Sequence, residues 1–271
     1  MLNLVALAIS GSLLMLAPTR AAAEEPVDVE LVIAVDVSWS MDYGELDIQR
    51  NGYVAAFRSP ELHEAIADGV HGRVAVTYVE WAGEMSQSVV LPWTLIDGKE
   101  AAEAFAYRLS NAAPDRLRRT SISSAIDFAA NLFDGNGFEG MRRVVDVSGD
   151  GPNNQGRPVT DARDAAIARG ITINGLPLMT QGDERQGAWG SIRDLDRYYS
   201  DCVIGGPGAF MIPVNDWEQF PEVVRRKLVL ELAGLWPLRQ PETAGVLKAA
   251  ADGGAANCLI GERQWQERWQ Q

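Results

Sequence analysis

A short apolar run that stops abruptly at polar residues constrains the fold more than any other feature of the chain. Residues 31–35 are all apolar, and Asp36, Ser38 and Ser40 follow at once. Such a run is typical of a strand buried on both faces of a parallel sheet. In open α/β sheets, ligands bind at the carboxyl ends of the strands, because the connecting loops diverge there. The polar residues therefore lie at the predicted ligand-binding edge.

The side chains at this edge predict a metal site. Asp36, Ser38 and Ser40 offer only hard oxygen donors, which favour Mg²⁺, Mn²⁺ or Ca²⁺ over zinc. Two later segments provide similar groups. Thr120 stands directly before a helical pattern, and Asp150 follows the apolar strand predicted over residues 142–148.

These three segments together resemble the metal-ion-dependent adhesion site of von Willebrand factor A domains. In that family, an Asp-x-Ser-x-Ser motif is completed by a threonine from a second loop and an aspartate from a third. The resemblance implies that one divalent cation, with Mg²⁺ expected first, is surrounded by Asp36, Ser38, Ser40, Thr120 and Asp150.

Two details of these loops bear on the site. Family members commonly carry glycine before the threonine, whereas this chain has Arg119, which places positive charge near the predicted ion. Gly149 and Gly151 flank Asp150, and we expect them to let the backbone turn sharply.

A narrower resemblance covers residues 27–232. The blocks DVSWSM, VEWAG, VVDVSGDGPNN, ITINGLPL and DCVIGGPGAF resemble a bacterial family of secreted von Willebrand factor A-like proteins classed as a domain of unknown function. This resemblance implies an α/β fold with a doubly wound, Rossmann-like and mostly parallel sheet of about six strands, with helices on both faces. The strands predicted over residues 72–81 and 86–94 are separated by a connection so short that it indicates an antiparallel edge strand.

The ends of the chain indicate export. Residues 4–17 are apolar apart from two serines, and small residues precede Glu24, which is typical of a signal peptide cleaved after Ala23. We therefore expect a signal peptide over 1–23, one domain over 27–233 and a partly irregular extension over 234–271. The mature protein is expected to be periplasmic or secreted, without an integral membrane span. Its formal net charge of −13 disfavours nucleic acid as a partner.

The chain has two cysteines, Cys202 and Cys258. If they pair, they close a loop of more than about fifty residues, which the chain-entropy model values at roughly 4 kcal/mol. Two unpaired, small buried residues are an equally good interpretation, because the sequence gives no distance between them.

Two further carboxylates belong to predicted strands. Asp146 stands among valines, so it is either a hydrogen-bonded structural residue, which we favour, or an outer-shell residue of the metal site. Glu80 ends the second strand, where we expect an exposed carboxylate.

The predicted function is metal-bridged protein binding, in which a partner presents Asp or Glu to the cation. Trp39 and Arg119 are the expected partner contacts beside the ion. One alternative is a Mg²⁺-dependent hydrolase or phosphoryl-transfer enzyme with Asp36 as nucleophile. Such enzymes normally need a second acid two residues on, where this chain has Ser38, and the sequence contains no phosphate-binding loop or nucleophile elbow. A second alternative is a structural envelope protein.

Overall fold

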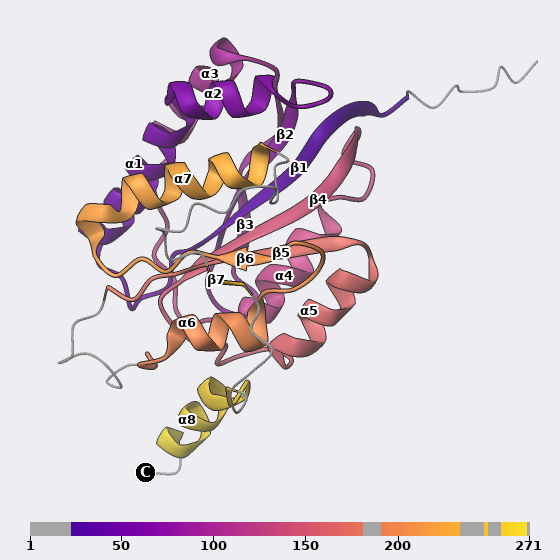
Figure 1. Cartoon of the computed structure of the whole chain (residues 1–271). Helices are drawn as coiled ribbons and strands as arrows, with labels where there is room; N and C mark the ends of the chain where they lie inside the picture. The colour runs from indigo at the N-terminus through magenta and orange to yellow at the C-terminus, as the bar shows by residue number, and fades with distance from the viewer. Residues whose placement is uncertain (1–22, 181–190, 234–246, 249–255, 270–271) are drawn as a thin grey trace, which may run out of the picture.

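The computed structural model describes residues 23–180, 191–233, 247–248 and 256–269 (Figure 1). Residues 1–22 of the predicted signal peptide lie outside these ranges, as does part of the predicted extension. None of the helices within them has the length and apolar character that crossing a bilayer requires. The boundaries of the signal peptide and of the extension remain predictions.

A single seven-stranded sheet forms the centre of the molecule, in the order β3-β2-β1-β4-β5-β6-β7 (Figure 1). Neighbouring strands are parallel from β2 to β6, whereas β3 lies antiparallel to β2. The predicted six-stranded α/β sheet with one antiparallel edge strand is confirmed, and a two-residue strand from the extension, β7, adds to it antiparallel to β6. The strands are β1 (Glu25–Asp36), β2 (Val74–Trp81), β3 (Gln87–Ile96), β4 (Phe138–Gly149), β5 (Ile171–Pro177), β6 (Phe210–Met211) and β7 (Leu247–Lys248).

β1 is buried on both faces, as its apolar run predicts. Leu31 and Ile33 belong to the core on one face of the sheet, and Val32 and Ala34 belong to the core on the other. β1 also lies where the strand order reverses, since β2 and β3 extend the sheet to one side and β4 begins the other. A reversal of this kind opens a crevice at the carboxyl ends of the two strands.

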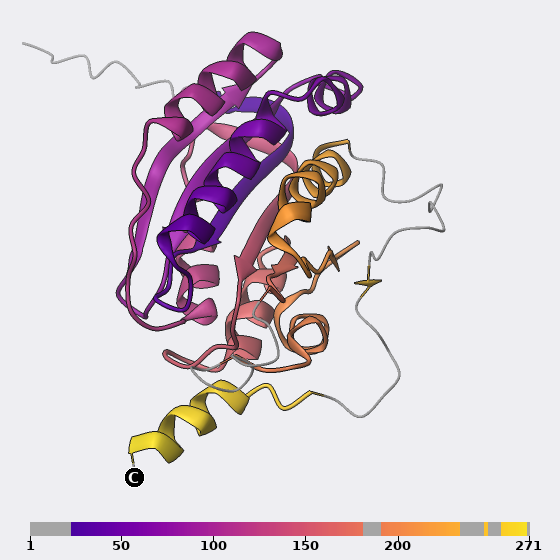
Figure 2. The same ribbon diagram turned by 90° about the vertical axis from the view of Figure 1, so that its left-hand side faces the viewer.

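Helices cover both faces of the sheet (Figures 1 and 2). The core that contains Leu31 is completed by α1, α2, α3 and α7, and the core that contains Val32 is completed by α4, α5 and α6. The helices are α1 (Tyr43–Phe57), α2 (Pro60–Ala67), α3 (Lys99–Ser110), α4 (Ile122–Asn131), α5 (Val159–Ala168), α6 (Leu195–Tyr198) and α7 (Phe220–Leu232), and a π-helical turn (Tyr199–Val203) continues α6.

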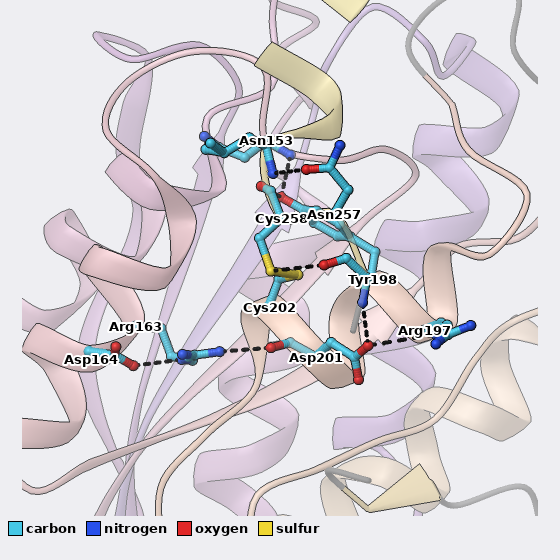
Figure 3. The surroundings of a disulfide bond; sticks show 11 residues. Asn153, Arg163, Asp164, Arg197, Tyr198, Asp201, Cys202, Asn257 and Cys258 are labelled. Carbon is cyan, nitrogen blue, oxygen red and sulfur yellow. Dashed lines mark hydrogen bonds and ion pairs between the residues drawn. A yellow bond between two sulfur atoms is a disulfide. The ribbon is translucent and has the colours of Figure 1, made fainter. Parts of the chain in front are cut away.

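The last helix, α8 (Ile260–Trp269), lies beyond the carboxyl edge of the sheet (Figures 1 and 2). A disulfide joins Cys258, just before α8, to Cys202 in the π-helical turn, with the two Cα atoms 5.5 Å apart (Figure 3). Asp201 supports the same junction, because its Oδ2 accepts a hydrogen bond from the amide of Ala256 at 2.8 Å. The pairing that the sequence left open is therefore present, and it fixes this part of the extension at the predicted ligand-binding edge.

Candidate metal centre

The first polar loop follows β1 directly and folds around the carboxylate of Asp36, which is 0% exposed. Its Oδ1 accepts a hydrogen bond from the amide of Ser38 at 2.7 Å. Its backbone oxygen accepts one from Gln49 of α1 at 3.0 Å. α1 begins directly after the loop, because Asp42 and Glu45 form a capping box. The loop is therefore fixed at both ends, by the sheet and by α1.

A chain of hydroxyl and carboxylate oxygens joins the first loop to the third. The Oγ atoms of Ser38 and Ser40 lie 2.9 Å apart. Ser40 Oγ in turn donates a hydrogen bond to Oδ1 of Asp150 at 2.8 Å. Asp150 follows β4, which pairs with β1 so that Val35 lies opposite Ser148. The parallel pairing thus brings together the first and third segments that the sequence singled out.

The second loop is attached to the other two through its backbone. Thr120 exchanges two hydrogen bonds with Asn154 of the third loop: its amide donates to Asn154 Oδ1 at 3.1 Å, and its carbonyl accepts from the Asn154 amide at 2.9 Å. The amide of Leu117 donates to the carbonyl of Val37 in the first loop at 2.9 Å. Thr120 is buried at this junction. All five predicted ligands therefore belong to loops that contact one another, although their role as ligands stays a prediction.

The two carboxylates of the site repel each other. Burial raises the pKa of Asp36 well above its ordinary value, and the charge of Asp150 raises it further. Hydrogen bonds from Ser38 and from the backbone of Asp150 act in the opposite direction but do not outweigh burial. A positive ion placed between the carboxylates would relieve this repulsion.

Gly149 brings a tyrosine close to the same carboxylate. A Cβ atom at position 149 would lie 2.9 Å from the Tyr199 hydroxyl and 3.0 Å from Asp36 Oδ2, so no larger residue fits there. The chain bends at Asp150 and Gly151, as we expected, and Gly149 in addition permits this close approach because it lacks a side chain. The sequence did not indicate Tyr199 at all, since no spacing links it to the metal loops.

The donor set fits a hard divalent cation. Asp36 Oδ2 is buried and accepts no hydrogen bond of normal geometry from the described residues. An unpartnered buried carboxylate oxygen is costly unless a cation or donor faces it. Within the part of the chain that the structure describes, no three His, Cys, Asp or Glu side chains are grouped as a metal site. Any ion here would therefore depend on hydroxyl and water oxygens beside two carboxylates, which suits Mg²⁺ better than zinc.

The two predicted partner-binding residues lie in the first and second loops. Trp39, between the two serines, is 50% exposed. Arg119 has a φ of 79°, the left-handed conformation that favours glycine, which accounts for the glycine common at this position in the family. Its guanidinium carbon lies 3.5 Å from the ring centroid of Trp265 in α8. The extension therefore contacts the loop that carries Thr120.

Two other carboxylates are used by the fold. The expectation that Glu80 is exposed was wrong: it is 3% exposed and forms an ion pair with Arg50 of α1. Asp146 is also buried, and its Oδ1 lies 2.5 Å from Nζ of Lys227 in α7. The structural interpretation of Asp146 is therefore supported. Neither cation was evident from the sequence, because each lies on a helix far from its partner along the chain.

Solved structures show the same fold. Proximal thread matrix protein 1 from the mussel byssus is 18% identical, with a TM-score of 0.53, over 78% of this chain and 50% of that one. A structure of the same protein with a zinc-occupied MIDAS motif gives a TM-score of 0.52 at 18% identity, over 79% of this chain and 50% of that one. The pilus adhesin SpaC from Lactobacillus rhamnosus GG is 10% identical, with a TM-score of 0.53, over 78% of this chain and 31% of the adhesin.

This chain thus spans half or less of the length of these proteins, and at such identities the similarity establishes a shared fold alone. A comparison with curated proteins gave no match. A family model described as "Protein of unknown function (DUF1194)" matches residues 26–236. The chain belongs to this family of unknown function and has the von Willebrand factor A fold.

Proposed function

We propose that this chain is an exported, divalent-cation-dependent protein-binding module, in which a bound Mg²⁺ bridges to an acidic residue of a partner. One observation carries the proposal. Asp36 and Asp150 converge at the switch point of the sheet, and one buried oxygen of Asp36 is without a normal hydrogen bond from the described residues. A divalent cation is the group that such a pair accommodates best.

The chain's own residues would hold this ion and leave room for a partner. Ser38 and Ser40 would bind it directly, and Asp36, Thr120 and Asp150 directly or through water. Mg²⁺ takes near-octahedral oxygen coordination and keeps waters readily. A carboxylate from a partner can replace one of these waters. Mn²⁺ or Ca²⁺ can be accommodated by the same oxygens.

The similar structures support binding rather than catalysis. One of these proteins is described as a matrix protein and another as an adhesin. The zinc-occupied motif of the mussel protein supports metal binding at the equivalent edge of this fold. No observation at the site favours Asp36 as a nucleophile, since Ser38 stands where such enzymes normally carry a second acid. The disulfide supports a periplasmic or secreted location.

Calorimetric titration of the mature protein with Mg²⁺ tests the site. We expect one ion per chain for the wild type and none for Asp36→Ala or Asp150→Ala. Asp134→Ala is the matched control, because this exposed aspartate pairs with Arg169 outside the metal loops and should not change the titration. If the wild type binds no ion, the proposal is wrong.

A pull-down tests the bridge to a partner. Tagged mature protein is incubated with envelope extract in Mg²⁺, and the bound proteins are eluted with EDTA. We expect a protein that Asp36→Ala does not capture and that loses binding when one of its own Asp or Glu residues is replaced. An ion that binds without any cation-dependent capture would instead support the structural envelope alternative.

A further inference from the structure

The loop between α3 and α4 carries three arginines beside the candidate metal centre. Arg116, Arg118 and Arg119 form no ion pair with any described carboxylate, whereas Arg157, in the third loop, pairs with Asp127. This is unusual in a chain whose formal net charge is −13. The three guanidinium groups are therefore left without an ion-pair partner among the described residues.

Aromatic rings alternate with these arginines. The guanidinium carbon of Arg116 lies 5.5 Å from the ring centroid of Tyr43 and 5.7 Å from that of Trp39. The guanidinium carbon of Arg118 lies 4.2 Å from the ring centroid of Trp39. Tyr43 is 63% exposed. The series reaches α8 through the contact between Arg119 and Trp265, and the resulting arginine–aromatic rim consists of Tyr43, Arg116, Trp39, Arg118, Arg119 and Trp265.

The arginines of the rim differ in whether their N–H groups already donate hydrogen bonds within the protein. Arg116 supports the first loop, because it donates hydrogen bonds to the carbonyls of Met41 at 2.6 Å and Trp39 at 2.9 Å. Arg118 and Arg119 donate no hydrogen bond to a described residue and contact only rings. A guanidinium stacked on a ring keeps its in-plane N–H groups free for a bidentate acceptor. Arg118 and Arg119 are thus preorganised donors.

α8 forms the far wall of the rim and is fixed by several contacts. The Cys202–Cys258 disulfide lies directly before it. Glu262 accepts a hydrogen bond from Asn153 of the third loop at 2.7 Å. Gly261 approaches that loop so closely that a Cβ there would lie 2.1 Å from the Asn153 carbonyl oxygen. The position of Trp265 is therefore tied to the metal loops.

We propose that the arginine–aromatic rim is a docking surface for an acidic segment of a protein partner. The proposal rests on the proposed function and deepens it: one carboxylate of the segment goes to the cation, and neighbouring carboxylates go to Arg118 and Arg119. Nucleic acid or an anionic membrane needs an extended positive surface, which a chain of net charge −13 does not provide. A short acidic segment needs only this local cluster, and Trp39 offers it an apolar contact.

The test uses a fluorescein-labelled oligoglutamate peptide and fluorescence anisotropy with the mature, disulfide-bonded protein, in Mg²⁺ and in EDTA. The negative charge of the rest of the surface repels this peptide, so binding reports the rim. Replacing both donors, in Arg118→Gln with Arg119→Gln, should weaken binding at least about tenfold in both buffers. The same variant should bind Mg²⁺ as the wild type does. Arg225→Gln, at a partly exposed arginine of α7 far from these loops in the chain, is the matched control and should leave binding unchanged.

The two buffers separate this inference from the proposed function. Asp36→Ala should remove only the increment of affinity that Mg²⁺ adds, and should bind the peptide in EDTA as the wild type does. Equal peptide affinity of the wild type and the double variant in EDTA would overturn the docking surface, whatever happens to the Mg²⁺ increment. Preferential binding of the rim to vesicles of equal parts phosphatidylglycerol and phosphatidylcholine, or to heparin, would also overturn it.

Discussion

At the scale of single residues, Arg119 combines an unfavourable backbone with a useful side chain. It is the one non-glycine residue of the described ranges with positive φ. The left-handed conformation costs an ordinary L-residue roughly 1–2 kcal/mol. Its guanidinium, however, contacts the ring of Trp265 in α8. Glycine would remove the strain but also the positive charge and the contact between the second loop and the extension.

Substitutions at position 119 should separate these two effects. Arg119→Val should lower the free energy of unfolding by about 1–2 kcal/mol, because a β-branched residue tolerates positive φ poorly. Arg119→Gly should be more stable than Arg119→Val by at least about 1 kcal/mol, although it loses the contact with Trp265. Urea denaturation measures both. Equal stability of the two variants would show that this backbone position is not strained.

Because the two carboxylates of the metal site repel each other, Asp36→Asn should raise the stability of the protein without the ion and lower it with the ion. Asp36→Asn keeps an acceptor for the Ser38 amide but removes the charge that Asp150 repels. In EDTA, this variant should unfold at a higher temperature than the wild type. In Mg²⁺, the wild type should gain about 2.7 kcal/mol at a concentration one hundred times its dissociation constant, and the variant should gain almost nothing.

The pH dependence of the same site has a definite sign. The pKa of Asp36 is raised in the folded protein, so between the ordinary pKa of an aspartate and this raised pKa, folding takes up a proton. The metal-free wild type should therefore lose stability as the pH rises from the ordinary to the raised pKa, and Asp36→Asn should lack that part of the loss. Mg²⁺ should bind more weakly at low pH, since it competes with the proton. Thermal melts in EDTA and Mg²⁺ across the acid range measure both effects.

At the scale of elements, the sequence predicts what depends on nearby residues. The apolar run 31–35 and the abrupt polar loop after it identify β1 and its place in the sheet, because the pattern of a doubly buried strand is local. The location of α8 is different. It depends on the Cys202–Cys258 bond and on Asn153, which are far apart in the chain, so no periodicity within α8 indicates where the helix lies. Glu80 was misjudged for the same reason, since its partner Arg50 lies on another element.

The disulfide should hold α8 as a unit without supporting the sheet. Cys258→Ser removes the link between residues 56 positions apart, which should lower the free energy of unfolding by about 2–4 kcal/mol. Hydrogen exchange in the native state should accelerate at the amides of α8, whereas those of β1 and β4 should still exchange only by global unfolding. Ala256→Ser, a nearby change that keeps the disulfide, is the control. Unchanged protection of α8 in Cys258→Ser would mean that Asn153 and Arg119 suffice to hold it.

At the scale of the whole molecule, α7 is joined to the sheet by a buried charged cluster. Lys227, 1% exposed, forms ion pairs with Asp146 of β4 and with Glu231 of its own helix. Asn174 of β5 donates a hydrogen bond to Glu231 at 2.9 Å. Two carboxylates thus share one ammonium group in a buried position. The pKa of Glu231 is raised from 4.5 to about 7: burial is the largest cause, the charge of Asp146 adds to it, and Lys227 acts in the opposite direction.

This cluster should make the stability of the whole domain fall between mildly acidic and neutral pH. From pH 4.5 to about 7, the folded protein keeps a proton on Glu231 that the unfolded chain has released, so the free energy of unfolding decreases as the pH rises and levels off above that window. The total change is about 3.5 kcal/mol at most, since each pKa unit between 4.5 and about 7 corresponds to about 1.4 kcal/mol. Glu231→Gln keeps the shape and the contact with Asn174 but does not titrate, so its stability should vary less over the same range. Urea unfolding in EDTA at several pH values measures the difference. Glu222→Gln, on the exposed side of α7, is the control. Parallel profiles for Glu231→Gln and the wild type would show that the proton is held elsewhere.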